Sequence, residues 1–146
     1  MDIFLEEFDY KDNYIEFCTL LKQLTILDIN QISHEKFLNH LSQIKSNSFH
    51  KIIIAKNNEK IVGSITIIIE PKFIHELSYA AHIEDVVVDS AYRSYGIGSL
   101  LINKAIEIAK GFSCYKIILD CSEKNVEFYK KNGFDIKGVQ MALYLE

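Results

Sequence analysis

Apolar residues in this chain follow two spacings, which predict where strands and helices lie. Runs rich in β-branched and aromatic residues favour strands at residues 3–8, 51–56, 60–70 and 79–88. Helical spacing follows Asp9, a candidate cap, and returns after Ser33. The inward positions of these two helices are Tyr14, Phe17, Cys18, Leu21 and Leu24, then Phe37, Leu41 and Ile44. Alternation from Ile61 to Ile69 predicts one continuous apolar face on that strand.

The second half of the chain begins with a long amphipathic helix. Its apolar stripe comprises Ile97, Leu100, Leu101, Ala105, Ile108, Ala109 and Phe112. A short buried strand is predicted at 116–120, then a helix that Ser122 caps and Gly133 ends. Residues 134–136 and 141–145 supply the last strand. The order βααβββαβαβ predicts an α/β domain over residues 1–146, with a mixed sheet and helices on both faces.

Composition narrows the class of protein. The 146 residues suit one domain, and 49% hydrophobic with 25% charged residues is typical of a globular protein. A net charge of −4 without a basic stripe argues against nucleic-acid binding. The three cysteines have no metal or redox spacing, and the five histidines form no i, i+4 pair, so we expect no metal site. We find no secretory leader or membrane-spanning run and expect a cytoplasmic protein.

A glycine-punctuated basic turn separates the strand at 79–88 from the long helix. Gly96 and Gly98 leave backbone N–H groups uncovered at a helix N-terminus, which favours phosphate binding. Two patterns compete. In the dinucleotide fingerprint, Asp120 lies at the acidic position, but Leu101 occupies the third glycine position. The other pattern, Arg93-Ser-Tyr-Gly-Ile-Gly98, resembles the acetyl-CoA pyrophosphate loop of the GNAT superfamily of N-acetyltransferases.

A second group of motifs resembles the glucosamine-6-phosphate N-acetyltransferase family within that superfamily. These motifs are Leu21–Thr25, Ile74–Leu77, His82–Val88, Cys114–Cys121, Asn125–Tyr129 and Gly133-Phe134. The resemblance implies a GNAT fold with a mostly antiparallel sheet and acetyl transfer from acetyl-CoA to the 2-amine of glucosamine 6-phosphate. It also implies a homodimer with the sugar site at the subunit interface.

The resemblance assigns the cofactor contacts. The pyrophosphate loop comprises Arg93, Ser94, Tyr95, Gly96, Ile97, Gly98 and Ser99. The backbone of Val86, Val87 and Val88 is expected to pair with the pantetheine amides like an added strand. Asn125 and Tyr129 are four residues apart on one predicted helix face, where Asn125 would hold the pantetheine arm and Tyr129 would donate to the departing sulfur.

Three carboxylates are candidates for the acceptor amine. Glu84, Asp85 and Asp120 lie at or near strand ends. On a regular strand Glu84 and Asp85 point to opposite faces, so only one enters the site unless a bulge re-aims them. In the resembled family all three positions lie at the sugar. We place Glu84 and Asp120 near the amine and Asp85 beside a sugar hydroxyl.

The sugar phosphate requires cations or N–H groups. Candidates are Lys72, His75 and Lys116, with a hydroxyl from Thr25, and the resemblance also assigns Ile74 to the substrate site. The chain departs from the family at Tyr144, which occupies the position of an arginine directed toward the phosphate. A tyrosine hydroxyl bonds phosphate without adding charge.

Other functions fit parts of the pattern. An acidic acceptor groove without phosphate cations favours a related acetyltransferase acting on a polyamine, another amine metabolite or a protein amino terminus. A catalytically silent CoA-binding module is the alternative from another class. Cys114 or Cys121 as an acetyl-carrying nucleophile is the mechanistic alternative, but no histidine is placed predictably beside either.

Overall fold

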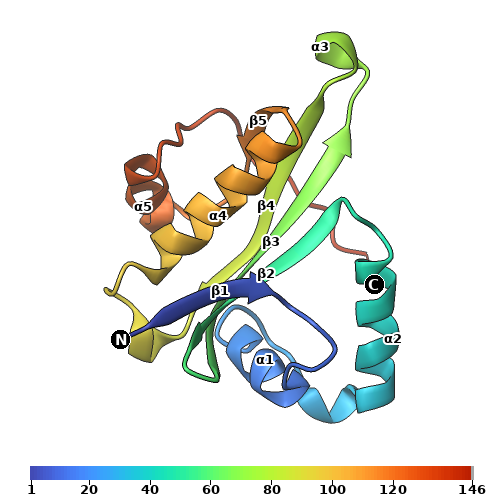
Figure 1. Cartoon of the computed structure of the whole chain (residues 1–146). Helices are drawn as coiled ribbons and strands as arrows, with labels where there is room; N and C mark the ends of the chain where they lie inside the picture. Colours follow the sequence, from blue (N-terminus) through green and yellow to red (C-terminus); the bar gives the residue numbers. More distant parts are fainter. Residues whose placement is uncertain (146) are drawn as a thin grey trace.

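A five-stranded sheet forms the centre of the computed structural model, which describes residues 1–145 (Figure 1). Its strands are β1 (Ile3–Glu7), β2 (His50–Asn57), β3 (Lys60–Pro71), β4 (Tyr79–Val88) and β5 (Cys114–Ile118), in that spatial order. The first three pairings are antiparallel, and β4 pairs with β5 in parallel. The parallel pairing is reached through the crossover helix α4 (Ile97–Gly111). The predicted mixed sheet is confirmed.

Helices cover both faces of this sheet (Figure 1). On one face α4 packs beside α5 (Val126–Lys131), and on the other lie α1 (Tyr14–Leu21) and α2 (His34–Lys45). Single turns occupy Ile29–Gln31 (η1), Ile74–Leu77 (α3), Ser90–Tyr92 (η2) and Glu123–Asn125 (η3). In residues 1–145, no helix has both the length and the apolarity needed to cross a membrane.

Each face of the sheet has its own apolar core. On the α4 face, Ile97, Leu101, Ala105 and Ala109 are buried against the strands, which confirms most of the predicted stripe. Ile102 joins them, whereas Leu100 is 42% exposed. The second core consists of Phe8, Phe17, Leu20, Leu41, Ile54, Ile61 and Val87.

The predicted continuous apolar face of β3 is wrong at Ile61. Ala55 pairs with Gly63 but Lys56 pairs with Ile61, so Val62 is an extra residue in β3. A bulge of this kind reverses the alternation of side chains. Ile61 therefore packs in the α1–α2 core, while Val62 joins the core under α4.

The helix caps were predicted with mixed success. Ser33 caps α2 as expected, because its Oγ accepts a hydrogen bond from the Lys36 N–H at 3.1 Å. Asp9 does not cap α1; Asn13 does, since its Oδ1 accepts from the Glu16 N–H at 3.0 Å. Ser122 precedes η3 without a side-chain cap bond, and α5 begins only at Val126. Gly133 is left-handed as predicted, with φ +96°.

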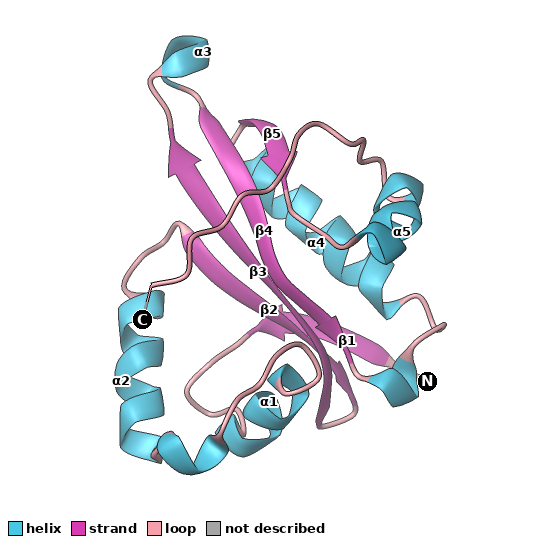
Figure 2. Ribbon diagram, turned by 180° about the vertical axis from the view of Figure 1, so that it is seen from behind, coloured by secondary structure: helices cyan, strands magenta, loops and turns pink. Residues whose placement is uncertain are grey.

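The C-terminal strand predictions are wrong in two respects. Strand β5 ends at Ile118 and is largely exposed, because it is the edge of the sheet and only one face packs on α4. Residues 134–145 form no strand, and Figure 2 shows them as a loop that crosses in front of β4 and β3. Val139, Met141, Leu143 and Leu145 in this segment are 85–91% exposed. A strand needs a hydrogen-bonding neighbour, and nothing in residues 1–145 pairs with this segment.

Candidate active site

Strand β4 is irregular at the position where the carboxylates were predicted. Thr66 pairs with Glu84 and Ser64 pairs with Val87, so Asp85 and Val86 together stand opposite Ile65. Asp85 has φ +48°, in the left-handed region that non-glycine residues rarely adopt. This is a β-bulge. It satisfies the condition under which Glu84 and Asp85 enter one site.

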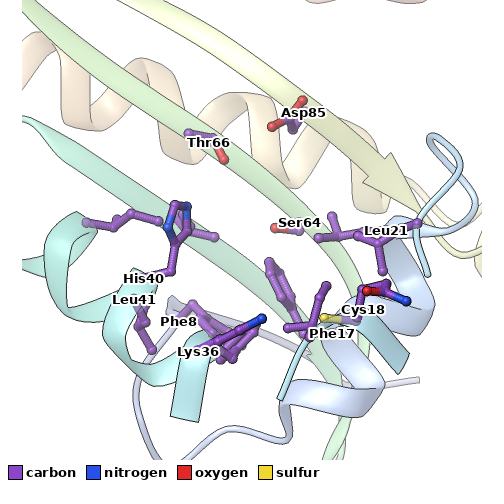
Figure 3. A pocket seen from close by; sticks show the side chains of 16 residues that line it. Phe8, Phe17, Cys18, Leu21, Lys36, His40, Leu41, Ser64, Thr66 and Asp85 are labelled. Atoms are coloured by element: carbon purple, nitrogen blue, oxygen red, sulfur yellow. The ribbon is translucent and has the colours of Figure 1, made fainter. Parts of the chain in front are cut away.

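Both carboxylates stand on the α1–α2 face of the sheet. Paired residues of neighbouring strands share a face, so Glu84 stands on the same face as Thr66. Asp85 lines a pocket of about 440 Å³ together with Ser64 and Thr66. Figure 3 shows these two hydroxyl-bearing side chains on β3 between Asp85 and the pocket residues of α1 and α2.

Sequence reasoning missed this pocket. Its remaining lining is mainly apolar and comes mostly from α1, α2 and the loop between them, together with Phe8 and Ile52, and α2 contributes Lys36 and His40. The available signal was Ser64 and Thr66, two polar residues in a run of isoleucines, which are only 2% and 8% exposed. Polar side chains buried in an otherwise apolar strand are an informative exception.

Beyond His82 the sheet opens between β4 and β5. The parallel pairing ends at His82 and Ile118, although β4 continues to Val88 (Figure 1). Residues 83–88 therefore present an unpaired edge toward β5, which is suited to hydrogen bonding with an extended ligand. Continuing the register by two residues brings Glu84 opposite Asp120 across this opening.

The turn after β4 leaves backbone N–H groups uncovered at the start of α4. Asp89 Oδ1 accepts from the Ala91 N–H at 2.9 Å, and Arg93 Nε donates to the Val88 carbonyl at 3.2 Å. Gly96 has φ +79° and precedes α4 without a side-chain cap bond. The first N–H groups of a fifteen-residue helix therefore remain available where the pyrophosphate loop was predicted.

Helix α5 packs against this turn through Phe128. A Cβ at Gly98 would lie 2.9 Å from Phe128 Cζ, so any larger residue there would require the Phe128 ring to shift. Tyr129 packs edge-on against Phe128 and Phe134 and is half-buried. Burial, with a smaller effect of nearby Cys121, raises the pKa of the Tyr129 phenol. Asn125 precedes α5 rather than lying within it, and its Nδ2 donates to Ser122 Oγ at 3.2 Å.

Two of the predicted phosphate ligands come together at the end of the sheet. The His75 and Tyr115 rings are in contact, with centroids 4.1 Å apart and planes tilted by 31°, and Lys116 Nζ lies 5.4 Å from the centroid of the same tyrosine ring. Ile74 and His75 belong to α3, a projecting turn in which His75 has φ +52°. Lys72 lies at the base of this turn, with Nζ 3.5 Å from Glu70 Oε1.

The other two substrate candidates lie in different segments. Thr25 is exposed in the loop after α1, and Tyr144 is 93% exposed in the C-terminal segment. Among residues 1–145, no hydrogen bond connects either side chain to the Lys72–His75 turn. Sequence reasoning missed Gln23, whose Oε1 accepts from the Ser90 N–H at 2.8 Å. This contact ties the loop that carries Thr25 to the start of the cofactor turn, and no sequence pattern indicates it.

Comparison with known proteins agrees with this geometry. Residues 15–134 match the model of the acetyltransferase (GNAT) family. The chain belongs to the GNAT family. Glucosamine 6-phosphate N-acetyltransferase 1 of Dictyostelium discoideum is 39% identical over 140 residues, covering 94% of this chain and 85% of the relative. The Arabidopsis thaliana enzyme of that name is 36% identical over 145 residues, covering 97% and 94%.

Solved structures give the same result for the GNAT fold. The crystal structure of glucosamine-6-phosphate N-acetyltransferase from Arabidopsis thaliana matches with a TM-score of 0.94 at 33% identity, covering 100% of both chains. A Trypanosoma brucei acetyltransferase matches with a TM-score of 0.90 at 35% identity, covering 99% of this chain and 100% of the other. The resemblance inferred from the motifs is confirmed.

Replacing Gly96 by valine tests the GNAT phosphate turn. No atom lies within 4 Å of a Cβ built at Gly96, so the new side chain would project into open space beside the turn. The backbone would also be strained, because valine rarely adopts the φ of +79° found at this position. We expect acetyl-CoA affinity to fall by about 100-fold or more. Isothermal titration measures the affinity, and circular dichroism checks the fold.

Gly111→Val is the matched control, because a Cβ there also meets nothing within 4 Å and lies at the far end of α4. Normal acetyl-CoA affinity in Gly96→Val would remove the assigned role of the turn.

Proposed function

We propose that this protein transfers the acetyl group of acetyl-CoA to the 2-amine of D-glucosamine 6-phosphate. The products are N-acetyl-D-glucosamine 6-phosphate and CoA, and the reaction is a step of UDP-N-acetylglucosamine synthesis. One observation carries the proposal: the bulge in β4 brings Glu84 and Asp85 onto one face directly before the phosphate turn. Relatives named for this reaction match 94% and 97% of this chain.

The open edge of β4 supports the assigned acetyl-CoA contacts. Backbone groups of residues 86–88 pair with the pantetheine arm as an added strand, and the N-terminus of α4 with Arg93 binds the pyrophosphate. Ser94, Tyr95 and Ser99 complete the loop around the phosphates, and Asn125 holds the arm from the α5 side. Burial between the β4 edge and α5 keeps water from the thioester.

Acetyl transfer then proceeds in one ternary complex. The neutral amine attacks the thioester carbonyl carbon, a C–N bond forms and the C–S bond breaks. Glu84 or Asp120 accepts the proton released by nitrogen, while the Tyr129 phenol donates a proton to the departing sulfur. Asp85 holds a sugar hydroxyl. Burial raises the pKa of the Cys114 thiol, which disfavours its thiolate as an acetyl carrier.

Removing the Tyr129 hydroxyl tests its role as an acid. We expect Tyr129→Phe to lower kcat by about 100-fold while the Kd for CoA changes less than threefold. Because the pKa of Tyr129 is raised, the phenol stays protonated through the ordinary tyrosine range. Loss of this proton should therefore not lower wild-type kcat below about pH 10. Steady-state kinetics at several pH values measures both effects, and unchanged turnover in Tyr129→Phe contradicts the role.

Two lysines and a histidine support the sugar-phosphate assignment. His75 and Lys116 both lie against Tyr115, Lys72 lies at the base of the α3 turn that carries His75, and Ile74 is proposed to provide an apolar wall beside them. Thr25 and Tyr144 are proposed to reach the phosphate with their hydroxyls. Because Tyr144 adds no charge, the two lysines carry most of the electrostatic attraction.

We further propose a homodimer in which the sugar site lies at the subunit interface. The C-terminal segment exposes an alternating apolar row, and Phe73 and Leu77 on the α3 turn are 91% and 69% exposed. Apolar surface of this extent marks an interaction site. A second copy would pair with the C-terminal segment and bring Thr25 and Tyr144 near the Lys72–His75 turn of its partner.

The mass in solution tests the dimer. Light scattering after size exclusion should give twice the 16.9 kDa of the chain. Truncation after Gly138 should shift the protein toward the monomer and raise KM for the sugar phosphate. A wild-type monomer with full activity would contradict the interfacial site.

We also propose that the protein acts in the cytoplasm. Cys18, Cys114 and Cys121 are free thiols, which suits a reducing compartment. Fractionation of the source cells with an antibody tests this, and recovery in a secretory or membrane fraction would contradict it.

A polyamine or another small amine is the second candidate acceptor. Three carboxylates beside the opening, two on β4 and one after β5, attract a polycation, and Tyr144 lacks the charge expected at a phosphate site. A non-catalytic CoA-binding module would bind acetyl-CoA but release no thiol with any amine.

The decisive assay compares free-thiol release from acetyl-CoA with glucosamine 6-phosphate, glucosamine and spermidine. The proposed function predicts rapid release with the phosphorylated sugar and kcat/KM at least about 100-fold lower with glucosamine, since a charge-assisted phosphate contact is lost. Release with spermidine alone favours the polyamine reading. No release with any of the three favours the binding module.

A further inference from the structure

The Glu70 carboxylate contacts two side chains from different parts of the sheet, Lys72 and His82. Its Oε1 lies 2.9 Å from His82 Nε2 and 3.5 Å from Lys72 Nζ. Glu70 lies near the end of β3, Lys72 follows that strand, and His82 lies on β4. One carboxylate oxygen therefore bridges the end of β3 and the middle of β4.

Each partner of Glu70 adjoins a different part of the proposed sugar site. Lys72 lies at the base of the α3 turn, where its N–H donates to the Ser78 carbonyl at 2.7 Å. His82 stands two residues before Glu84 and on the same face of β4, at the last pairing with β5. Lys72, Glu70 and His82 therefore form a row from the phosphate side of the proposed site to the acceptor carboxylate, Glu84.

The two partners of Glu70 both favour the ionised form of its carboxyl group. The hydrogen bond from His82 lowers the pKa of the Glu70 carboxyl, and the nearby Lys72 adds to this effect. An ionised Glu70 carboxylate holds the flexible Lys72 side chain in one position. The rotamer entropy of Lys72 is therefore lost before the ligand binds, which reduces the entropy cost of binding. The Lys72 and His82 side chains are 27% and 29% exposed and that of Glu70 is 45% exposed, so water screens this contact substantially and its effect is local positioning rather than stability.

We propose that Glu70 is a positioning residue that holds Lys72 for the phosphate of the sugar and fixes His82 beside Glu84. This inference rests on the proposed function, because it takes Lys72 as a phosphate ligand. Glu70 itself does not touch the substrate. Glu70 therefore affects substrate binding and the preference for the phosphorylated over the unphosphorylated sugar. Both effects require Lys72.

The test begins with Glu70→Gln, which keeps the shape of the side chain and removes its charge. We expect KM for glucosamine 6-phosphate to rise about five- to tenfold, with kcat changed less than twofold. The preference for glucosamine 6-phosphate over glucosamine should fall by the same factor. Glu59→Gln, an exposed carboxylate in the β2–β3 turn, is the matched control and should leave both constants unchanged.

A double-mutant cycle with Lys72→Met separates positioning from a general structural role. If Glu70 acts through Lys72, Glu70→Gln adds nothing to the KM of Lys72→Met. Full additivity of the two substitutions would overturn the inference. So would a KM for Glu70→Gln within twofold of the wild type, or a loss of kcat and thermal stability with no change in KM.

Failure of the proposed function gives a different result. In that case the wild type releases no thiol with glucosamine 6-phosphate, whatever residue stands at position 70. Titration with inorganic phosphate then decides the inference. Weaker phosphate binding in both Glu70→Gln and Lys72→Met supports it, and equal binding in wild type and variants overturns it.

Discussion

The bulge at Asp85 is the constraint on which the functional geometry depends. A regular β4 would direct Glu84 and Asp85 to opposite faces and keep the strand straight along its neighbour. The extra residue brings both carboxylates to the α1–α2 face, and the pairing with β5 ends shortly before it. One local irregularity thus accompanies both an acidic acceptor face and an open edge for an extended ligand. The positive φ of Asp85 is an observed strain at that point.

The cofactor turn and the two helices beside it are organised around this strand. Helix α4 lies close to β3 because Gly63 has no side chain; a Cβ there would be 3.1 Å from Leu101 Cδ1. Gly98 likewise admits Phe128, whose ring packs edge-on against Tyr129. Burial of Tyr129 also raises the pKa of its phenol, so the packing around this residue favours the protonated form that the proposed acid role requires.

Features governed by short stretches of chain were predictable from the sequence. The turn from Arg93 to Gly98, the Ser33 cap and the left-handed Gly133 each depend on a few neighbouring residues, and all three are confirmed. Features that need a distant partner were not. The bulge at Val62 moved Ile61 to the other core, and the contact of Gln23 with Ser90 spans 67 residues. The last predicted strand has the right alternation, but no neighbouring strand in residues 1–145 pairs with it.

The central claim is that the open edge of β4 receives acetyl-CoA beside the acceptor carboxylates. Amide hydrogen exchange with and without CoA tests it most directly, because an added strand protects backbone N–H groups. The account predicts slower exchange within residues 86–88 and in the first turn of α4, with little change in α2. Binding of CoA without protection at either segment would contradict it.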